Sequence, residues 1–166
     1  MGFTTGGSSS TPIFKEIASV NITSNCDSVS IENVNLANDE IYFFTILWYP
    51  NTTGLTNMYL YVNDDTEATN YLRQNFSASG SSVGGNRSGD AQIARCDDGG
   101  YSLVQGVLTL CNNYPIAIST SGRAATESGM CRMGHYWCRK VAGNVTKITF
   151  SAKFKAGSRI WLYSKK

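Results

Sequence analysis

Residues 144–157 read NVTKITFSAKFKAG, and they indicate the secondary structure of this protein more clearly than any other stretch. Apolar and polar side chains alternate along it with a period of two, which is the spacing that separates the two sides of a β-strand. One side is therefore expected in a hydrophobic core and the other in water. The apolar set is Ile148, Phe150, Ala152 and Phe154, and the polar set is Lys147, Thr149, Ser151, Lys153 and Lys155.

Short runs of β-branched and aromatic residues, separated by Gly, Asn, Asp and Ser clusters, recur along the rest of the chain, and strong helical periodicity is absent. Eight or more antiparallel strands in one domain predict an all-β fold, an antiparallel two-sheet β-sandwich of the jelly-roll type. Strands are predicted at residues 13–22, 28–34, 40–49, 56–63, 70–76, 91–95, 101–111, 114–119, 134–139, 145–154 and 158–163.

Length and composition predict one domain and argue against two kinds of partner. A chain of 166 residues buries roughly two thirds of its unfolded surface. Charged residues make up 16% of the chain and its net charge is +2, which is too little to steer it toward nucleic acid. The longest apolar runs, such as IYFFTILWY, fall well short of the roughly 20 residues of a membrane span. We therefore predict no nucleic-acid partner and no membrane partner.

The β-sandwich domain is expected at residues 13–166, after a flexible N-terminal arm at residues 1–12. The arm reads MGFTTGGSSSTP and has neither the positive charge nor the apolar run of a signal peptide, which argues against export. Two further polar stretches, at residues 77–90 and 119–129, are expected to be surface loops because they are rich in Gly and Ser.

The acidic stretch NDDTEATN, at residues 63–70, is the first candidate site. Asp64, Asp65 and Glu67 offer oxygen ligands to a cation such as calcium, but Asn and Asp also favour tight turns, and we interpret the stretch as a turn. A pair of carboxylates for glycoside cleavage stays open, because a sequence does not show the separation of the two groups. The candidates for such a pair are Asp64, Asp65, Glu67, Asp90, Asp97, Asp98 and Glu127.

The stretch CRMGHYWC, at residues 131–138, is the second candidate site. Cys131, His135 and Cys138 are of the types that bind zinc, but their spacing matches no standard zinc finger. His135 is the only histidine, and no recognisable nucleophile motif accompanies it. We predict no catalytic residue, no metal site and no cofactor, and we expect the five cysteines to be free thiols.

Aromatic residues form the third candidate, a surface that faces a glycan or a protein partner. Aromatic side chains on strands mostly fill cores and subunit interfaces, so the interface interpretation is favoured over sugar stacking. The residues that we select as glycan- or partner-facing are Tyr59, Tyr61, Arg87, Arg123 and Trp137.

Three segments resemble a family of small phage virion proteins, jelly-roll proteins that serve as capsid decoration, head-fibre or tail-fibre components. The first is YVNDDTEATNYLRQ, a strand, a polar turn and an Asn-Tyr pair that opens the next strand. The second is GVLTLCNNYPIAIST, a strand that leads into another Asn-Tyr pair. The third and most specific is the C-terminal TKITFSAKFKAGSRIWLYSKK, with its Gly-Ser-X-Ile-X-Leu-Tyr ending. The resemblance covers roughly residues 13 to 163, and the three segments occur in the same order as in the family.

The resemblance implies a non-enzymatic structural protein, a homotrimer that is made in the host cytoplasm and assembled onto the virion. The leading interpretation is a capsid decoration or cement protein that binds the major capsid protein or another virion protein. The alternative is a tail-fibre or head-fibre module that recognises host-surface glycan. The resemblance also implies that Asn63 and Asn70 bond locally and that Tyr71 starts a strand. Residues expected in the capsid- or neighbour-binding arm are Gly2, Phe3, Thr4, Thr5 and Pro12.

Overall fold

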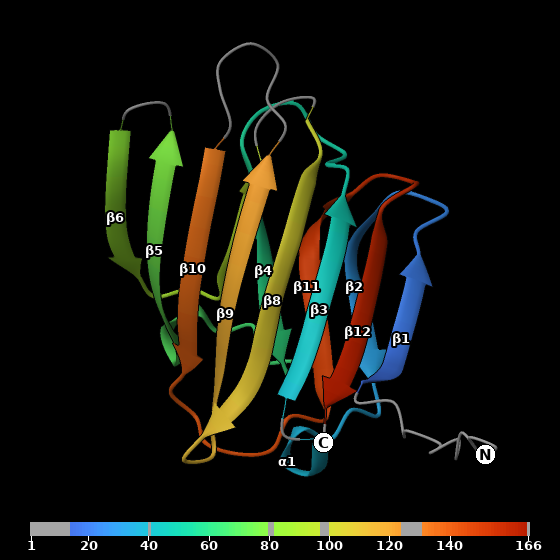
Figure 1. Ribbon diagram of the computed structural model, residues 1–166, viewed down its shortest axis with the longest axis vertical. Helices are drawn as coiled ribbons and strands as arrows, with labels where there is room; N and C mark the ends of the chain where they lie inside the picture. Colours follow the sequence, from blue (N-terminus) through green and yellow to red (C-terminus); the bar gives the residue numbers. More distant parts are fainter. Residues whose placement is uncertain (1–13, 40, 80–81, 97–99, 124–130, 166) are drawn as a thin grey trace, which may run out of the picture.

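The structure is a computed structural model, and it describes residues 14–39, 41–79, 82–96, 100–123 and 131–165; for residues 38, 79, 123 and 131–133 it describes the backbone alone. These residues form two antiparallel β-sheets, one of eight strands and one of four, which pack face to face (Figure 1). The predicted all-β, two-sheet sandwich is confirmed. No helix in the described ranges is long and apolar enough to cross a membrane.

The large sheet lies in front in Figure 1, with its strands in the order β1-β12-β3-β8-β9-β10-β5-β6 from right to left. The small sheet behind it has the order β2-β11-β4-β7. The strands of the large sheet are β1 (Lys15–Asn21), β3 (Ile41–Trp48), β5 (Tyr71–Ser79), β6 (Ser82–Ser88), β8 (Ser102–Cys111), β9 (Tyr114–Arg123), β10 (Cys131–Arg139) and β12 (Arg159–Lys165). Those of the small sheet are β2 (Cys26–Glu32), β4 (Thr56–Val62), β7 (Gln92–Cys96) and β11 (Lys147–Phe154).

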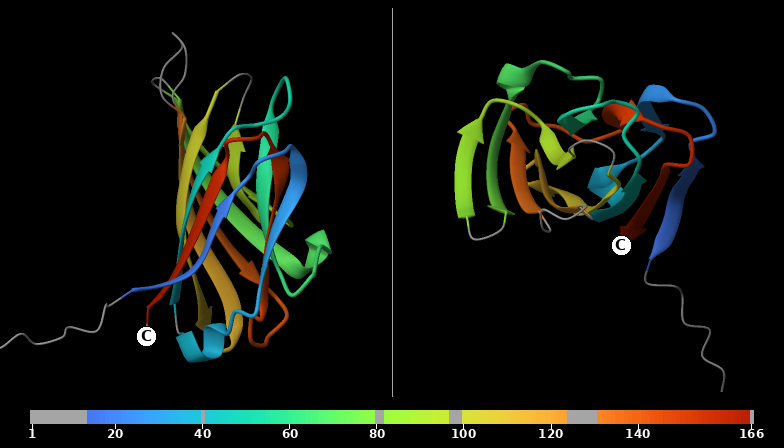
Figure 2. Two further views of the ribbon diagram at one scale, coloured as in Figure 1. Left: turned by 90° about the vertical axis from the view of Figure 1, so that its right-hand side faces the viewer. Right: turned by 90° about the horizontal axis from the view of Figure 1, so that it is seen from above.

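Eight of these strands have the pairing order of a jelly roll. Strands β1, β12, β3 and β8 are successive neighbours in the large sheet, and β2, β11, β4 and β7 are successive neighbours in the small sheet. The first four strands of the chain alternate between the two sheets. The other four strands form two hairpins, β5–β6 and β9–β10, which widen the large sheet on one side. Strand β7, at the edge of the small sheet, packs against β9 and β10, so β5 and β6 extend past it (Figures 1 and 2).

The core lies between the sheets and is built from the inward side of each strand. The alternating stretch at residues 144–157 contains β11, where Ile148, Phe150 and Phe154 are fully buried and Ala152 is 7% exposed. Strand β11 pairs with β2 on one side and with β4 on the other, so it lies in the middle of the small sheet. The predicted inward and outward sets of this strand are confirmed. Met58, Leu60 and Val62 of β4 are also fully buried, as their alternation with Tyr59 and Tyr61 indicated.

Two segments predicted as loops contain strand, and the predictions were wrong for the residues that form it. Within residues 77–90, β5 continues to Ser79 and β6 follows, although β6 has only exposed or half-buried side chains. Within residues 119–129, β9 continues to Arg123, and residues 124–130 lie outside the described part. Both segments are poor in apolar residues, so they give no strand signal, but the backbone pairs of β5 with β6 and of β9 with β10 hold them in the sheet.

Short helices and turns connect the strands. Helix α1 (Leu36–Asp39) precedes β3, and a single 3-10 turn, η1 (Ala68–Asn70), precedes β5; neither was predicted. A two-residue turn joins β8 to β9, and both of its residues, Asn112 and Asn113, have positive φ angles of 51° and 66°. Asn tolerates this left-handed conformation, which type I′ hairpin turns require at both central residues.

Candidate functional site

The acidic stretch NDDTEATN connects β4 to β5, and its buried carboxylate stabilises that connection. Asp65 accepts hydrogen bonds from Asn70 Nδ2, at 3.0 and 3.1 Å, and from Arg139 Nε at 2.7 Å. The backbone oxygen of Asp65 accepts a bond of 2.7 Å from the hydroxyl of Tyr71, which begins β5. Glu67 caps the start of η1, where its side chain accepts a backbone hydrogen bond. The interpretation of this stretch as a turn is confirmed.

Asn63 fixes the same turn to another part of the chain. Its φ of +53° lies in the left-handed region, which Asn tolerates better than most residues. Its Oδ1 accepts from the amides of Thr146, at 2.8 Å, and Lys147, at 3.2 Å, and its Nδ2 donates to the carbonyl of Asn144 at 2.7 Å. The expectation of local bonding was therefore right for Asn70 and wrong for Asn63, because Asn63 reaches the segment that leads into β11.

A second carboxylate, Asp90, ties the connection between β6 and β7 to the large sheet. It forms a two-pronged ion pair with Arg73 of β5, whose side chain is 6% exposed, and it accepts a 3.0 Å bond from the amide of Gln92. Burial alone would raise the pKa of Asp90, but the hydrogen bonds from Arg73 and its neighbours outweigh burial and hold the pKa below its usual value. The pKa of Asp65 is lowered for the same reason, by Asn70 and Arg139 against the effect of burial.

The remaining candidates for a glycoside-cleaving pair of carboxylates do not form such a pair with Asp65 or Asp90 in the described residues. Asp64 is exposed and forms an ion pair of 2.9 Å with Lys147. Asp97, Asp98 and Glu127 lie outside the described residues. Each described carboxylate of the set is thus engaged in a turn, a cap or an ion pair.

His135 lies on the inward side of β10, where it is 2% exposed. Within the described residues neither of its ring nitrogens has a hydrogen-bond partner. Burial, together with the nearby positive charge of Arg73, lowers the pKa of His135 to about 4, although the charge of Asp90 opposes the shift. The cross-strand neighbour Ser119 donates to the carbonyl of Ile93, at 2.7 Å, and not to the imidazole. This histidine is therefore a buried, neutral side chain with no serine nucleophile bonded to it.

The candidate zinc ligands His135 and Cys138 lie on opposite sides of β10. His135 and Cys138 are three positions apart on one strand, so their side chains point to opposite faces. His135 is buried between the sheets, whereas Cys138 is half-buried on the outward side. The side chain of Cys131 is not among those described. One metal ion therefore does not contact both His135 and Cys138.

The five residues selected as glycan- or partner-facing are scattered over the molecule. Trp137 is fully buried and packs edge-on against Tyr71, with ring centroids 5.3 Å apart. Its prediction was wrong, because Trp137 lies on the inward side of β10. Tyr59 and Tyr61 are half-buried on the outward side of β4, and their rings are stacked 5.9 Å apart and nearly parallel, at 9°.

The other two members of that set lie on the large sheet. Arg87 is exposed on β6, where its backbone pairs with Gln74. Arg123 ends β9, and only its backbone is described. The predicted arm residues Gly2, Phe3, Thr4, Thr5 and Pro12 lie outside the described part of the chain.

The most unusual surface of the molecule is the outward side of the large sheet. We call the outward side chains of β12, β3, β8, β9, β10, β5 and β6 the open face. Large apolar side chains stand on it in the open, between 43% and 83% exposed, whereas a soluble monomer rarely shows a contiguous apolar patch above a few hundred Å². The six most central are Leu72, Phe76, Leu103, Tyr114, Ile118 and Tyr136.

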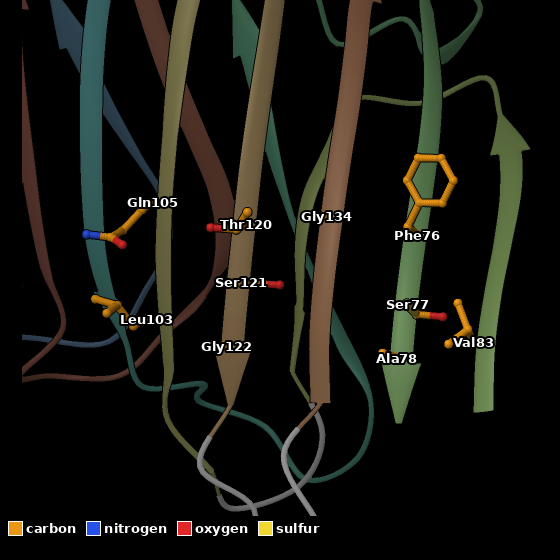
Figure 3. Close-up of a pocket in the computed structure, with 10 residues that line it drawn as sticks. All are labelled: Phe76, Ser77, Ala78, Val83, Leu103, Gln105, Thr120, Ser121, Gly122 and Gly134. Carbon is orange, nitrogen blue, oxygen red and sulfur yellow. The ribbon is translucent and has the colours of Figure 1, made fainter. Parts of the chain in front are cut away.

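A trough of about 430 Å³ crosses the open face. Gly122 and Gly134 form its floor, where an added Cβ atom would meet nothing within 4 Å. Figure 3 shows Leu103 of β8 on one side of the trough, and Phe76 of β5 and Val83 of β6 on the other. The absence of two side chains therefore makes a hollow between two apolar walls.

The seven strands that form the open face contain no Asp and no Glu. Among the described side chains of the face, the cations lie toward the margins, where Arg87 lies on β6 and Arg159 and Lys165 lie on β12. Arg132 of β10 pairs with Gly122 of β9, and only its backbone is described. The centre of the face, between β3 and β5, thus combines exposed apolar side chains with uncharged polar ones such as Gln105 and Thr120. This composition is typical of the core of a protein interface.

Sequence reasoning missed the open face, because the residues that it selected as partner-facing include none of the exposed apolar side chains of this face. The signal that was available is the outward set of β9, where Tyr114, Ile116 and Ile118 are apolar although Ala117 and Ser119 already face the core. The absence of acidic residues from seven strands was a second signal. It points to a single surface only once the strand order shows that these strands are neighbours.

The outward side of the small sheet, which we call the polar face, has the opposite composition. It carries the stacked Tyr59 and Tyr61 together with hydroxyl and charged side chains of β2 and β11. Lys147 lies 2.9 Å from Asp64 and 3.3 Å from Glu32. Hydrogen bonds with these two carboxylates raise the pKa of Lys147. The charges of the polar face are thus paired within the chain.

Comparisons with known proteins give no relative from which a function could be carried over. No protein-family model matches the chain, and no characterised protein matches its sequence at a significant level. The function is therefore inferred from the surfaces described above together with the resemblance of the three sequence segments.

Proposed function

We propose that this protein is a non-enzymatic structural component of a virion, a decoration or cement protein on the capsid of a tailed bacteriophage. The observation that carries the proposal is the open face, a broad apolar surface with an uncharged centre. Such a surface favours association with protein, because burying apolar area on contact is the main driving force of protein association. The virion and the capsid come from the resemblance of the sequence segments, and the open face supports the structural role.

The contacts of the buried and half-buried ionisable side chains also support a structural role. Asp65 and Asp90 are ion-paired with Arg139 and Arg73, and these pairs fix loops to the large sheet. His135 has no partner at either nitrogen in the described residues. General acid–base chemistry needs a titratable group within reach of a substrate, and these groups are instead enclosed by the fold.

In this proposal the protein binds the major capsid protein as a homotrimer, after synthesis in the host cytoplasm. The N-terminal arm, residues 1–12, would grip the shell or a neighbouring subunit. Three arms on one trimer raise retention by a factor of roughly a hundred or more over one weak contact.

Co-sedimentation with capsids that lack the protein tests the proposal. We expect saturable binding to the capsids and none to mock particles, with a protein that lacks residues 1–12 bound less tightly. Equal occupancy by the truncated protein would contradict the role of the arm. A protein that leaves the capsids unbound at all concentrations would contradict the decoration role itself.

The alternative role is a receptor-binding module of a tail fibre or head fibre that recognises host-surface glycan. The stacked rings of Tyr59 and Tyr61 favour this alternative, because parallel aromatic rings with hydrogen-bonding neighbours suit a sugar ring. Asn57 supplies such a neighbour, since its Nδ2 lies 3.3 Å from the Tyr59 hydroxyl. Glycan-array binding that is lost in Tyr59→Ala and Tyr61→Ala would support it, and the capsid assay would then be negative.

A further inference from the structure

We propose that the open face is the surface through which one copy of this chain binds a second copy. This inference rests on the proposed structural role and names the partner of that face. It assigns the contact to the centre of the large sheet, around Ile118 and Tyr136, and leaves the polar face of the small sheet in water.

The size of the open face fits a stable contact between two protein chains. Strands in a sheet lie about 4.8 Å apart and rise about 3.4 Å per residue, so the part from β3 to β6 measures about 700 Å². A standard protein interface buries about 800 Å² on each partner. One copy of the face therefore has the area that a specific complex needs.

The charge distribution favours a second copy over a different protein. A face that selects a different partner commonly carries charges that complement the charges of that partner. Around Ile118 and Tyr136 the described side chains carry no charge, and the charged residues of the seven strands are all basic. Arg132 of β10 pairs with Gly122 at the trough, and only its backbone is described. Two such faces can meet without placing a charge at Ile118 and Tyr136, and the marginal Arg87, Arg159 and Lys165 can stay in water.

The shape of the open face is also complementary to that of a second copy. Ile118 of β9 and Tyr136 of β10 lie directly opposite each other and form a ridge. The trough over Gly122 and Gly134 lies two to four residues along the same two strands, about 7 to 14 Å away. The ridge of one copy can therefore fill the trough of the next. The contact closes either as a two-fold pair or as a three-fold ring, since each copy supplies one ridge and one trough.

Three variants test this contact, and two of them change the open face. Ile118→Lys places a charge on the ridge, and Gly134→Leu fills the trough, where its side chain enters open space in the free chain. Thr149→Lys, at the centre of the polar face, is the matched control. Mass measurement by light scattering, over a concentration series, gives the dissociation constant for each protein, and circular dichroism verifies the fold.

We expect the unmodified chain to be a dimer or a trimer. Each open-face variant should raise the dissociation constant by about a hundredfold, the size of a hot-spot effect, while Thr149→Lys changes it little. A monomeric unmodified chain would overturn the inference, as would an oligomer that both open-face variants leave intact. A monomer that still binds capsids would overturn the inference and the homotrimer but leave the decoration role intact. An oligomer that ignores capsids would overturn only the proposed function.

A measurement on native thiols keeps the test valid if a variant does not fold. Cys138 is half-buried on the open face, beside Leu72 and Tyr136, whereas Cys26 lies on β2 of the small sheet. We expect maleimide labelling of Cys138 to slow as the protein concentration rises, while labelling of Cys26 keeps its rate. A rate for Cys138 that does not depend on concentration would overturn the inference.

Discussion

The open face and the polar face are both outward sides of β-sheets, but their side chains differ in what surrounds them. On the polar face, Lys147 is paired with Asp64 and Glu32, and Ser30 shares a hydrogen bond of 2.9 Å with Thr149. On the open face, large apolar side chains stand half-exposed, and no described residue of the chain covers them. The polar groups of the polar face are therefore satisfied within the chain and by water. The apolar side chains of the open face would instead be stabilised by contact with another surface that removes them from water.

The first test of this comparison uses two glycines on opposite sides of the large sheet. A Cβ atom on Gly106 would overlap the ring of Phe44 and lie 2.7 Å from the carbonyl oxygen of Ile118, whereas a Cβ on Gly134 would meet nothing within 4 Å. Gly106→Ala should lower the free energy of unfolding by about 3 kcal/mol, because the packed inward side cannot give way. Gly134→Ala should leave it unchanged or slightly raised. Urea denaturation of both variants makes the measurement, and equal losses would show that the outward side is as tightly packed as the inward side.

The second test compares two neighbouring carboxylates in one turn. The pair of Asp65 and Arg139 is 10% and 11% exposed, whereas Asp64 is 69% exposed beside Lys147. Asp65→Asn should lower the free energy of unfolding by about 2 kcal/mol, because the buried Arg139 charge loses its counter-charge. Asp64→Asn should have almost no effect, since surface pairs are weak and Asn tolerates its positive φ. Thermal unfolding measures both variants, and a larger loss for Asp64→Asn would contradict the assignment of the buried pair.

The third test concerns the interior beneath the open face, where His135 is buried. Its ordinary pKa is 6.5 and its pKa in the folded protein is about 4, so the unfolded chain binds a proton more readily. The stability that the neutral imidazole provides is complete above pH 6.5 and is lost as the pH falls toward 4. Between pH 7 and pH 5 the loss should be about 2 kcal/mol. Arg73 and Asp90, the charged groups nearest the imidazole, keep their charges over this range because the pKa of Asp90 is lowered from 3.8.

The His135→Phe variant is the control for this pH dependence. It cannot titrate, so its free energy of unfolding should change little between pH 7 and pH 5. Denaturant unfolding of both proteins at several pH values makes the comparison. If the free energy of unfolding of the variant fell with pH as steeply as that of the unmodified protein, the acid sensitivity would belong to other groups.

The smallest expected effect is the response of self-association to salt. Between 0.1 M and 1 M salt the screening length falls from about 10 Å to about 3 Å, but a contact with an uncharged centre is little affected. The dissociation constant should therefore change by less than about threefold over this range. A strong weakening by salt, measured by light scattering, would show that the charged side chains of the polar face make the contact instead.

The strands of the core could be predicted from local patterns, and the candidate site could not. Alternation identified β11 and β4 because their inward residues, such as Phe150 and Leu60, are all large and apolar. It missed β6, whose SVGGNRS sequence has no apolar side, since a strand held by backbone bonds at a sheet edge needs no such side. It also placed Trp137 on the surface, because the direction of a side chain depends on which side of β10 meets the small sheet.

The sequence by itself determined the all-β class, the two-sheet sandwich, the turn at NDDTEATN and the inward residues of the central strands. These depend on local rules, the period of two in a strand and the turn preferences of Asn and Asp, so neighbours in the chain are sufficient. Only the tertiary structure decided that seven strands without an acidic residue lie side by side, and that Ile118, Tyr136 and Phe76 share one uncovered surface. A surface patch is a property of neighbours in space, and β5 and β10 are neighbours although more than fifty residues separate them in the sequence.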